Sequence, residues 1–238
     1  MIAVLSLQGV IAQRMNMLVE YSGGTSTEIF GRQFDQAVSD KSISAIVLDV
    51  DSPGGEVFGV DELSQAIYSA RGEKPILAVA NSMMASAAYW IASAADEVAI
   101  TPGGEAGSIG VVAVHVDTSK AAEMEGLAYS LISAGRYKVE GNAYAPLEEG
   151  AREMIQGRVD DYYDMFVAAV VRNRKMSAGQ VRRGMGQGRM LGAKAAVAEG
   201  LVDRIETLDG SLQRVGRSRA GRSRTRAEKR LALMRLSV

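Results

Sequence analysis

Short apolar runs rich in branched residues alternate with segments of helical periodicity over the first part of the chain. Runs of this kind, bounded by Gly, Ser or Asp, are typical of buried strands. The predicted strands are Ile2–Leu7, Ile43–Val50, Ile76–Ala80, Val98–Thr101, Ile109–Val116 and Tyr129–Ile132. The predicted helices among them are Thr27–Val38, Asp61–Arg71, Ala87–Ala95 and Ser119–Glu125. This order predicts an α/β layered fold with mainly parallel strands and with helices packed outside the sheet.

The pattern changes after Pro146, where one apolar stripe continues at near-helical spacing. It predicts a long amphipathic helix from Leu147 to Arg174. A shorter helix, Ala193–Ala198, is predicted to end at Gly200 before a small final strand that begins at Leu201.

The balance of basic and acidic residues changes near residue 210. Residues 211–238 hold nine Lys or Arg and one acid, which leaves 18 basic and 27 acidic residues in 1–210. Arg alternating with Ser, Gly, Ala and Thr cannot bury enough apolar surface to fold. The sequence therefore predicts a folded domain over 1–210 and an Arg-rich flexible tail over 211–238. Such a tail would bind nucleic acid or an acidic protein surface in a salt-dependent manner, or serve only to keep the protein soluble.

Composition excludes several classes of site. The 238 residues include no Cys and one His, which excludes disulfides, thiolate zinc sites, iron–sulfur clusters, cysteine nucleophiles and His-rich metal sites. We expect neither a metal nor another cofactor, since nothing matches a Walker loop or a dinucleotide fingerprint.

No run approaches the roughly 18 to 20 apolar residues of a membrane span, and Met1–Leu7 lacks the features of a signal peptide. We therefore expect a cytoplasmic location.

Two strand ends carry residues from which catalytic chemistry could be built. Asp51-Ser52-Pro53-Gly54-Gly55 follows one predicted strand, and its paired glycines either form a tight turn or direct backbone N–H groups into a cleft. Ser86 follows the next strand, at the start of a helix of small residues. There it is either an ordinary N-cap or a nucleophile beside the free N–H groups of the helix.

A nucleophilic serine requires a base, and the chain offers two candidates. His115, the single histidine, lies in the predicted strand Ile109–Val116, whereas Lys138 follows the predicted strand Tyr129–Ile132. A lysine that acts as a base must be neutral, which requires a buried apolar pocket. The alternative for an isolated lysine is a solvated surface charge.

Together these segments resemble the signal peptide peptidase A (SppA) family of serine proteases, which is related in fold to the Clp protease and crotonase superfamily. Ser52-Pro53-Gly54-Gly55 resembles the oxyanion loop of the family, and Ala85-Ser86-Ala87-Ala88-Tyr89 resembles its nucleophile segment. The other similar segments are Gly107-Ser108-Ile109-Gly110-Val111, Gly135-Arg136-Tyr137-Lys138, Gly188-Arg189-Met190-Leu191 and Glu199-Gly200-Leu201-Val202-Asp203. The resemblance spans about residues 2–206, with the motifs in the family order.

The resemblance implies a Ser/Lys dyad in which Ser86 attacks the scissile carbonyl and Lys138 is the general base. It also implies an oxyanion hole formed by the N–H groups of Gly55 and Ala87, with Ser108 orienting Lys138. The nucleophile segment departs from the family pattern because Ala87 and Ala88 follow the serine, where glycine is common in the family. This narrows the space beside the nucleophile, so we expect slower turnover or smaller substrates.

Cellular members of the family are membrane-anchored, and the sequence shows no anchor. It therefore resembles the branch that tailed bacteriophages use as prohead proteases. That branch implies scaffold and capsid proteins as substrates during head maturation, and a location in the host cytoplasm or procapsid. The family further implies a ring-shaped homo-oligomer, with the dyad formed either within one chain or between two.

Several alternatives stay open on the sequence alone. The base could be His115, with Asp117 as the acid of a Ser/His/Asp triad like that of the Clp protease. The protein could also be a soluble bacterial signal-peptide-peptidase-like protease, a catalytically silent capsid or scaffold component, or an acyl-CoA enzyme of the crotonase type.

Overall fold

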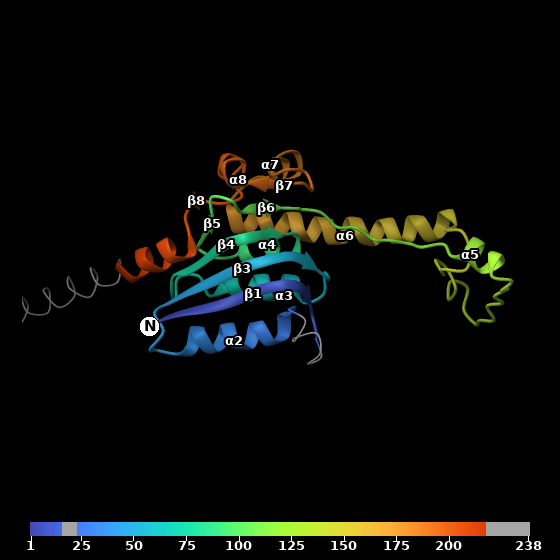
Figure 1. The fold of residues 1–238 in the computed structure, drawn as a ribbon, viewed down its shortest axis with the longest axis horizontal. Coiled ribbons are helices and arrows are strands. Elements are labelled where there is room, and N and C mark those ends of the chain that lie inside the picture. The colour runs from blue at the N-terminus through green and yellow to red at the C-terminus, as the bar shows by residue number, and fades with distance from the viewer. Residues whose placement is uncertain (16–22, 218–238) are drawn as a thin grey trace, which may run out of the picture. The chain divides into compact units, whose positions relative to one another are not determined.

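The computed structural model describes residues 1–15 and 23–217, and the strands within them form a single sheet (Figure 1). The strands are β1 (Ile2–Ala12), β2 (Thr25–Ser26), β3 (Ala45–Gly55), β4 (Ile76–Ala85), β5 (Glu97–Ile100), β6 (Glu105–Gly107), β7 (Met190–Gly192) and β8 (Arg204–Ile205). Their order is β2-β1-β3-β4-β5-β8, and β6 pairs with the end of β4 and with β7. All of these pairs are parallel except β6 with β7, which confirms the predicted α/β fold with mainly parallel strands.

The helices labelled in Figure 1 are α2 (Thr27–Ser39), α3 (Val60–Ser69), α4 (Ala87–Ala92), α5 (Ser119–Met124), α6 (Glu149–Arg174), α7 (Ala178–Arg183) and α8 (Ala193–Ala198). A further helix occupies 208–217, the last described residues. None of the helices in the described ranges combines the length and apolar character that crossing a bilayer requires. The chain divides into two compact units, with Met1–Ile109 and Phe166–Val238 in unit 1 and Gly110–Met165 in unit 2.

The central strands of unit 1 are buried on both faces. Strands β1, β3, β4 and β5 follow one another across the sheet, and right-handed crossovers then place α2, α3 and α4 on the same face. Ile46 and Leu48 point to that face and are fully buried. Val47, which points the opposite way, is also fully buried, because the 208–217 helix covers the second face. This explains why the strand has a continuous apolar run rather than an alternating one.

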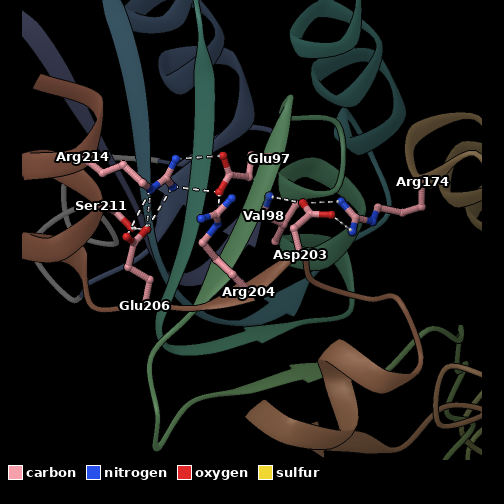
Figure 2. Close-up of polar contacts among 8 residues, drawn as sticks. All are labelled: Glu97, Val98, Arg174, Asp203, Arg204, Glu206, Ser211 and Arg214. Atoms are coloured by element: carbon pink, nitrogen blue, oxygen red, sulfur yellow. Dashed lines mark hydrogen bonds and ion pairs between the residues drawn. The ribbon is translucent and has the colours of Figure 1, made fainter. Parts of the chain in front are cut away.

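The 208–217 helix is fastened to the sheet by packing and by charge. Its apolar side chains pack on side chains of strands β1, β3, β4 and β5. The cluster is made of Ile2, Val47, Leu77, Val79, Ala99, Leu208, Leu212 and Val215. Arg214 donates to both oxygens of Glu97, at 2.7 and 3.1 Å, and also to Glu206 at 2.9 Å (Figure 2). Arg204 pairs with the same Glu97 carboxylate. The hydrogen bond from Arg214 holds the pKa of Glu206 below its usual value.

The predicted domain boundary at residue 210 therefore lies inside a packed helix. Residues 211–217, predicted as the start of the flexible tail, belong to unit 1. The remainder of that tail, 218–238, lies outside the described residues.

Two predicted strands are wrong. Ile109–Val116 and Tyr129–Ile132 contain no strand, and within the described part of the chain no other segment pairs with them. Val112 is 82% exposed and Val114 81% exposed in the first of these segments. Branched apolar residues favour a strand only where a neighbouring strand supplies hydrogen bonds, and no strand of the described chain pairs with these two segments.

Candidate active site

Ser86 lies between the end of β4 and the first residue of α4, in a backbone conformation that serine rarely adopts. Its φ is 53° and its ψ is −122°, and its side chain makes no capping hydrogen bond to the helix. The N-cap serines Ser26 and Ser177 instead have extended backbones and accept hydrogen bonds from Ile29 and Gln180. Holding a residue in such a sparsely populated region costs on the order of 1–3 kcal/mol. Ser86 therefore does not serve as an ordinary N-cap.

The Ser52–Gly55 segment lies directly against Ser86. Ser52 is fully buried; its hydroxyl donates to the carbonyl of Gly9 at 2.6 Å and accepts from the N–H of Gly54 at 3.1 Å. Gly54 has a φ of 94°, and a Cβ on it would lie 2.7 Å from Cβ of Ser86 and 3.0 Å from the nitrogen of Ala87. Only glycine allows this approach.

The predicted loop is in fact the end of strand β3. Gly55 pairs with Ile11 of β1, and the next residue, Glu56, donates to the carbonyl of Ile11 at 2.8 Å. Successive N–H groups along a strand point to opposite sides. The N–H of Gly55 therefore points away from β1, toward the side on which β4 lies.

Ser108 follows β6 as Ser86 follows β4. The two strands pair through Ala85 and Gly107, and the N–H of Ser86 donates to the carbonyl of Gly107 at 2.9 Å. Ser108 also has a positive φ, 55°, and its N–H donates to the carbonyl of Arg189 at 3.0 Å. The Gly188–Leu191 motif thus supports the segment that carries Ser108, through the antiparallel pairing of β7 with β6.

The Glu199–Asp203 motif holds α4 and α6 in place. The hydroxyl of Tyr89 in α4 is fully buried and donates to the carbonyl of Leu201 at 2.9 Å, and this burial raises the pKa of the phenol. Asp203 accepts two hydrogen bonds from Arg174, at 2.7 and 3.0 Å, and one from the N–H of Val98 at 2.7 Å (Figure 2). Burial opposes ionisation of Asp203, but these hydrogen bonds keep its pKa below the usual value.

Lys138 belongs to unit 2, in a series of turns. Its N–H donates to the carbonyl of Gly135 at 3.2 Å, and its side chain is exposed. Ser86 belongs to unit 1, so neither unit by itself contains the predicted dyad.

The two residues of the alternative triad also lie in unit 2, and each has another partner. His115 Nε2 lies 2.9 Å from the carbonyl oxygen of Asn142. The carboxylate of Asp117 accepts from the N–H of Ser119 at 2.9 Å, at the start of α5, and its hydrogen bonds with Ser119 lower its pKa. Asp117 is thus engaged in local structure at the start of α5.

Unit 1 brings together four of the predicted positions, Ser86, Ala87, Gly55 and Ser108, at the carboxyl ends of adjacent strands. Sequence reasoning missed the part played by Ser52, whose hydroxyl orders the glycine segment; its position immediately before Pro-Gly-Gly was the available signal. Among the described residues no group of three or more His, Asp or Glu is placed to hold a metal ion.

Comparison with known proteins decides the family. The model of peptidase family S49 matches residues 69–220. This chain belongs to peptidase family S49. The match includes Ser86, Ser108 and Lys138, and it confirms the resemblance to SppA-type proteases.

Two phage proteins are among the curated relatives of this S49 chain. Capsid assembly protease C of Escherichia phage lambda is 38% identical over 169 residues, covering 71% of this chain and 38% of that protein. Head-tail preconnector protein GP5 of Enterobacteria phage P21 is 33% identical over 199 residues, covering 84% of this chain and 38% of that protein. The chain thus spans well under half the length of these relatives.

A solved structure confirms the fold of the S49 chain. A point mutant of ClpP1 from Listeria monocytogenes matches with a TM-score of 0.52 and 16% identity, covering 87% of this chain and 93% of that one. The predicted Clp protease-like fold is confirmed.

Proposed function

We propose that this S49 chain is a serine endopeptidase in which Ser86 is the nucleophile and Lys138 is the general base. The observation that carries the proposal is the backbone of Ser86. It is held at a φ of 53° with no capping role, against a glycine segment whose approach no larger residue allows. A strained serine packed in this way is expected where the strain serves a function.

In the proposed mechanism, Oγ of Ser86 attacks the scissile carbonyl carbon while its proton passes to Nζ of Lys138. The carbonyl oxygen becomes an oxyanion that accepts hydrogen bonds from the N–H groups of Gly55 and Ala87. Collapse of the intermediate breaks the C–N bond, and Lys138 returns the proton to the leaving amine. Water then attacks the acyl-enzyme by the same route and releases the second product. Ser108 orients Lys138 in this scheme.

Lysine is preferred to histidine as the base because Nε2 of His115 lies at the carbonyl oxygen of Asn142, and Asp117, the acid of the triad, accepts from Ser119. A basic lysine nevertheless requires an apolar environment, and Lys138 is exposed in the single chain. We therefore propose that a second copy of the chain completes the site within a ring-shaped homo-oligomer. The apolar side chains that unit 2 exposes support this, among them Val112, Val114 and Ile132, the last at 98%.

Mixing separately inactive chains tests whether the dyad forms between subunits. We expect Ser86→Ala and Lys138→Ala chains to regain activity when they are mixed, denatured and reassembled together. Activity that stays absent in the mixture, while parent chains treated in the same way recover theirs, would place the dyad within one chain. Sedimentation of a Val112→Asp/Val114→Asp variant tests the interface, and a smaller particle than that of the parent is expected.

For the substrate, we propose scaffold and capsid proteins of a phage head, acted on in the host cytoplasm or procapsid. The support is the 38% identity to a phage capsid assembly protease. Residues 218–238 carry seven Lys or Arg and one Glu, and we propose that this segment docks on an acidic protein surface or on nucleic acid. Loss of salt-dependent binding in a chain ending at residue 217 would support the docking role.

Peptide hydrolysis tests the proposed activity. Denatured casein is incubated with the parent chain and with Ser86→Ala, and the new peptide termini are identified by mass spectrometry. Cleavage by the parent alone is expected. Absence of cleavage by an assembled parent would favour a catalytically silent shell component. Thioester hydrolysis without peptide cleavage would favour the crotonase-type alternative.

A further inference from the structure

The end of α4 that lies away from Ser86 is held by a buried polar network. All six residues of α4 are at most 4% exposed. The N–H of Trp90 donates to the carbonyl of Ser86 at 3.0 Å. The carbonyl of the same Trp90 accepts from the hydroxyls of Ser93, at 2.9 Å, and Ser64, at 3.2 Å. One residue, Trp90, thus connects the backbone of Ser86 to two buried hydroxyl groups.

Asn173, near the end of α6, is the hub of this network. It is 3% exposed, and its amide nitrogen donates to Ser93 Oγ at 2.9 Å and to Ser64 Oγ at 3.3 Å. Its amide oxygen accepts from Nε of Arg172 at 3.0 Å. Because Asn173 supplies both donors, the two serine hydroxyls act as acceptors toward it and keep their own hydrogens for Trp90.

Arg71 binds backbone carbonyls that follow the carboxyl end of α4 and the backbone carbonyl of Asn173. Its guanidinium donates to the carbonyls of Ala95 at 2.6 Å, Ala94 at 2.8 Å and Ser93 at 3.2 Å, and to the backbone carbonyl of Asn173 at 3.1 Å. The last turn of α6 and the end of α4 are therefore bound to the same cation. These contacts all lie within unit 1.

We infer that Asn173 is a positioning residue for Ser86, acting through Ser93, Ser64 and the backbone C=O and N–H of Trp90. The inference rests on the proposed function, since it requires Ser86 to be the nucleophile. A residue held in a strained conformation stays there only when its surroundings over-determine it. Only two hydrogen bonds, both made by the backbone of Trp90, separate Ser86 from the hydroxyl of Ser93.

The substitution Asn173→Asp removes the hydrogen-bond donors of the side chain and keeps the shape of the side chain. It therefore tests whether donation by Asn173 positions Ser86. A carboxylate accepts hydrogen bonds and cannot donate them. Ser93 and Ser64 would therefore turn their hydroxyl hydrogens toward residue 173 and release the carbonyl of Trp90. The new charge lies beside Arg172 and Arg71, so the fold is expected to tolerate it.

The experiment measures acylation of Ser86 by a fluorophosphonate as a function of probe concentration, at 20 °C, well below the unfolding temperature of each variant. Saturation separates the maximal rate of reaction from the apparent Kd of the probe. The variants are Asn173→Asp, Ser93→Ala, their combination, and Gln36→Glu on the exposed surface of α2 as the charge-matched control. Circular dichroism and thermal unfolding accompany each measurement.

For Asn173→Asp we expect a maximal rate at least tenfold lower, an apparent Kd within twofold of the parent, and an unchanged circular dichroism spectrum. The maximal rate of the double variant should be little lower than that of the slower single variant, because both changes act through Trp90. Gln36→Glu should match the parent. A parent-like maximal rate in Asn173→Asp, with labelling of the parent intact, would overturn the positioning role alone. An assembled parent that is never labelled at Ser86 would overturn both this inference and the proposed function.

Discussion

Gly54 approaches Ser86 so closely that a single methyl group would not fit between them. A Cβ built on Gly54 lies 2.7 Å from Cβ of Ser86, and the φ of Gly54 is 94°. The close approach and the positive φ are separate reasons for glycine, and both concern the position of the proposed nucleophile. The contact also links the end of β3 to the end of β4, where the oxyanion donors are proposed to lie.

Replacing Gly54 with alanine should therefore abolish peptide cleavage and lower the free energy of unfolding by about 2 kcal/mol, since alanine is strained at a positive φ and has no space here. Casein hydrolysis and thermal unfolding measure the two effects. Gly103→Ala is the control, because nothing lies within 4 Å of a Cβ at Gly103. Full activity in Gly54→Ala would contradict the proposed arrangement of the glycine segment.

The ion pairs of Arg214 should contribute to stability more than an isolated surface pair does. Its guanidinium contacts Glu97 and Glu206 together, and its side chain is 33% exposed. Arg214→Ala should lower the free energy of unfolding by about 1 kcal/mol, which corresponds to a fall in Tm of about 2–4 °C. Arg217→Ala, which removes the same charge from an exposed position, should leave Tm within about 1 °C of the parent. Equal effects of the two changes would remove the case for a specific network.

Truncation should separate the packed part of the carboxyl-terminal region from the rest. A chain ending at residue 217 keeps the 208–217 helix and should unfold at nearly the Tm of the full chain. A chain ending at residue 207 exposes Val47, Leu77 and Val79, and we expect a lower Tm and aggregation. Thermal scanning with light scattering compares the two. Equal Tm values would show that the helix contributes nothing to the fold.

Lowering the pH should lower the free energy of unfolding, because Asp203 becomes protonated. Its pKa is lowered in the folded state, so its stabilising effect is complete above the ordinary pKa of an aspartate and is lost as the pH falls through the lowered value. We expect the free energy of unfolding to be flat from about pH 7 to 5 and to fall below about pH 4.

Asp203→Asn should reduce this dependence and cost about 1 kcal/mol at pH 7, a modest figure because the side chain is 37% exposed. Urea unfolding at several pH values measures both quantities, with Asp35→Asn on the surface of α2 as the control. If the free energy of unfolding falls equally steeply with decreasing pH in Asp203→Asn and in the parent, the carboxylate of Asp203 does not cause the fall.

The sequence predicted the central sheet well because its strands are buried on both faces. The continuous apolar run around Val47 is typical of such strands, and its helix neighbours follow regular periodicity. The prediction failed for Ile109–Val116, whose valines have the composition of a strand but no partner in the described chain. The 208–217 helix was missed for the opposite reason. Its three apolar residues, Leu208, Leu212 and Val215, lie beside an Arg-rich segment, so the composition indicated a flexible tail. Their packing on the sheet is a tertiary contact that the sequence pattern did not indicate.

The candidate site was predictable where residue identity fixes geometry. The paired glycines and the small residues after Ser86 indicated a close backbone approach, and the structure has one. Sequence could not distinguish Ser86 from the capping serine Ser26, because the difference lies in a backbone angle. It also gave no sign of Asn173, whose importance arises from contacts with residues 80 and 109 positions away in the chain.

Covalent labelling tests the Ser86/Lys138 dyad most directly. The intact mass of each chain is measured after treatment with a fluorophosphonate, for the parent, Ser86→Ala, Lys138→Ala and His115→Ala. We predict one adduct on the parent, located on Ser86, none on Ser86→Ala or Lys138→Ala, and an adduct of parent-like yield on His115→Ala. Labelling that survives in Lys138→Ala and disappears in His115→Ala would contradict the dyad and assign the base to the histidine.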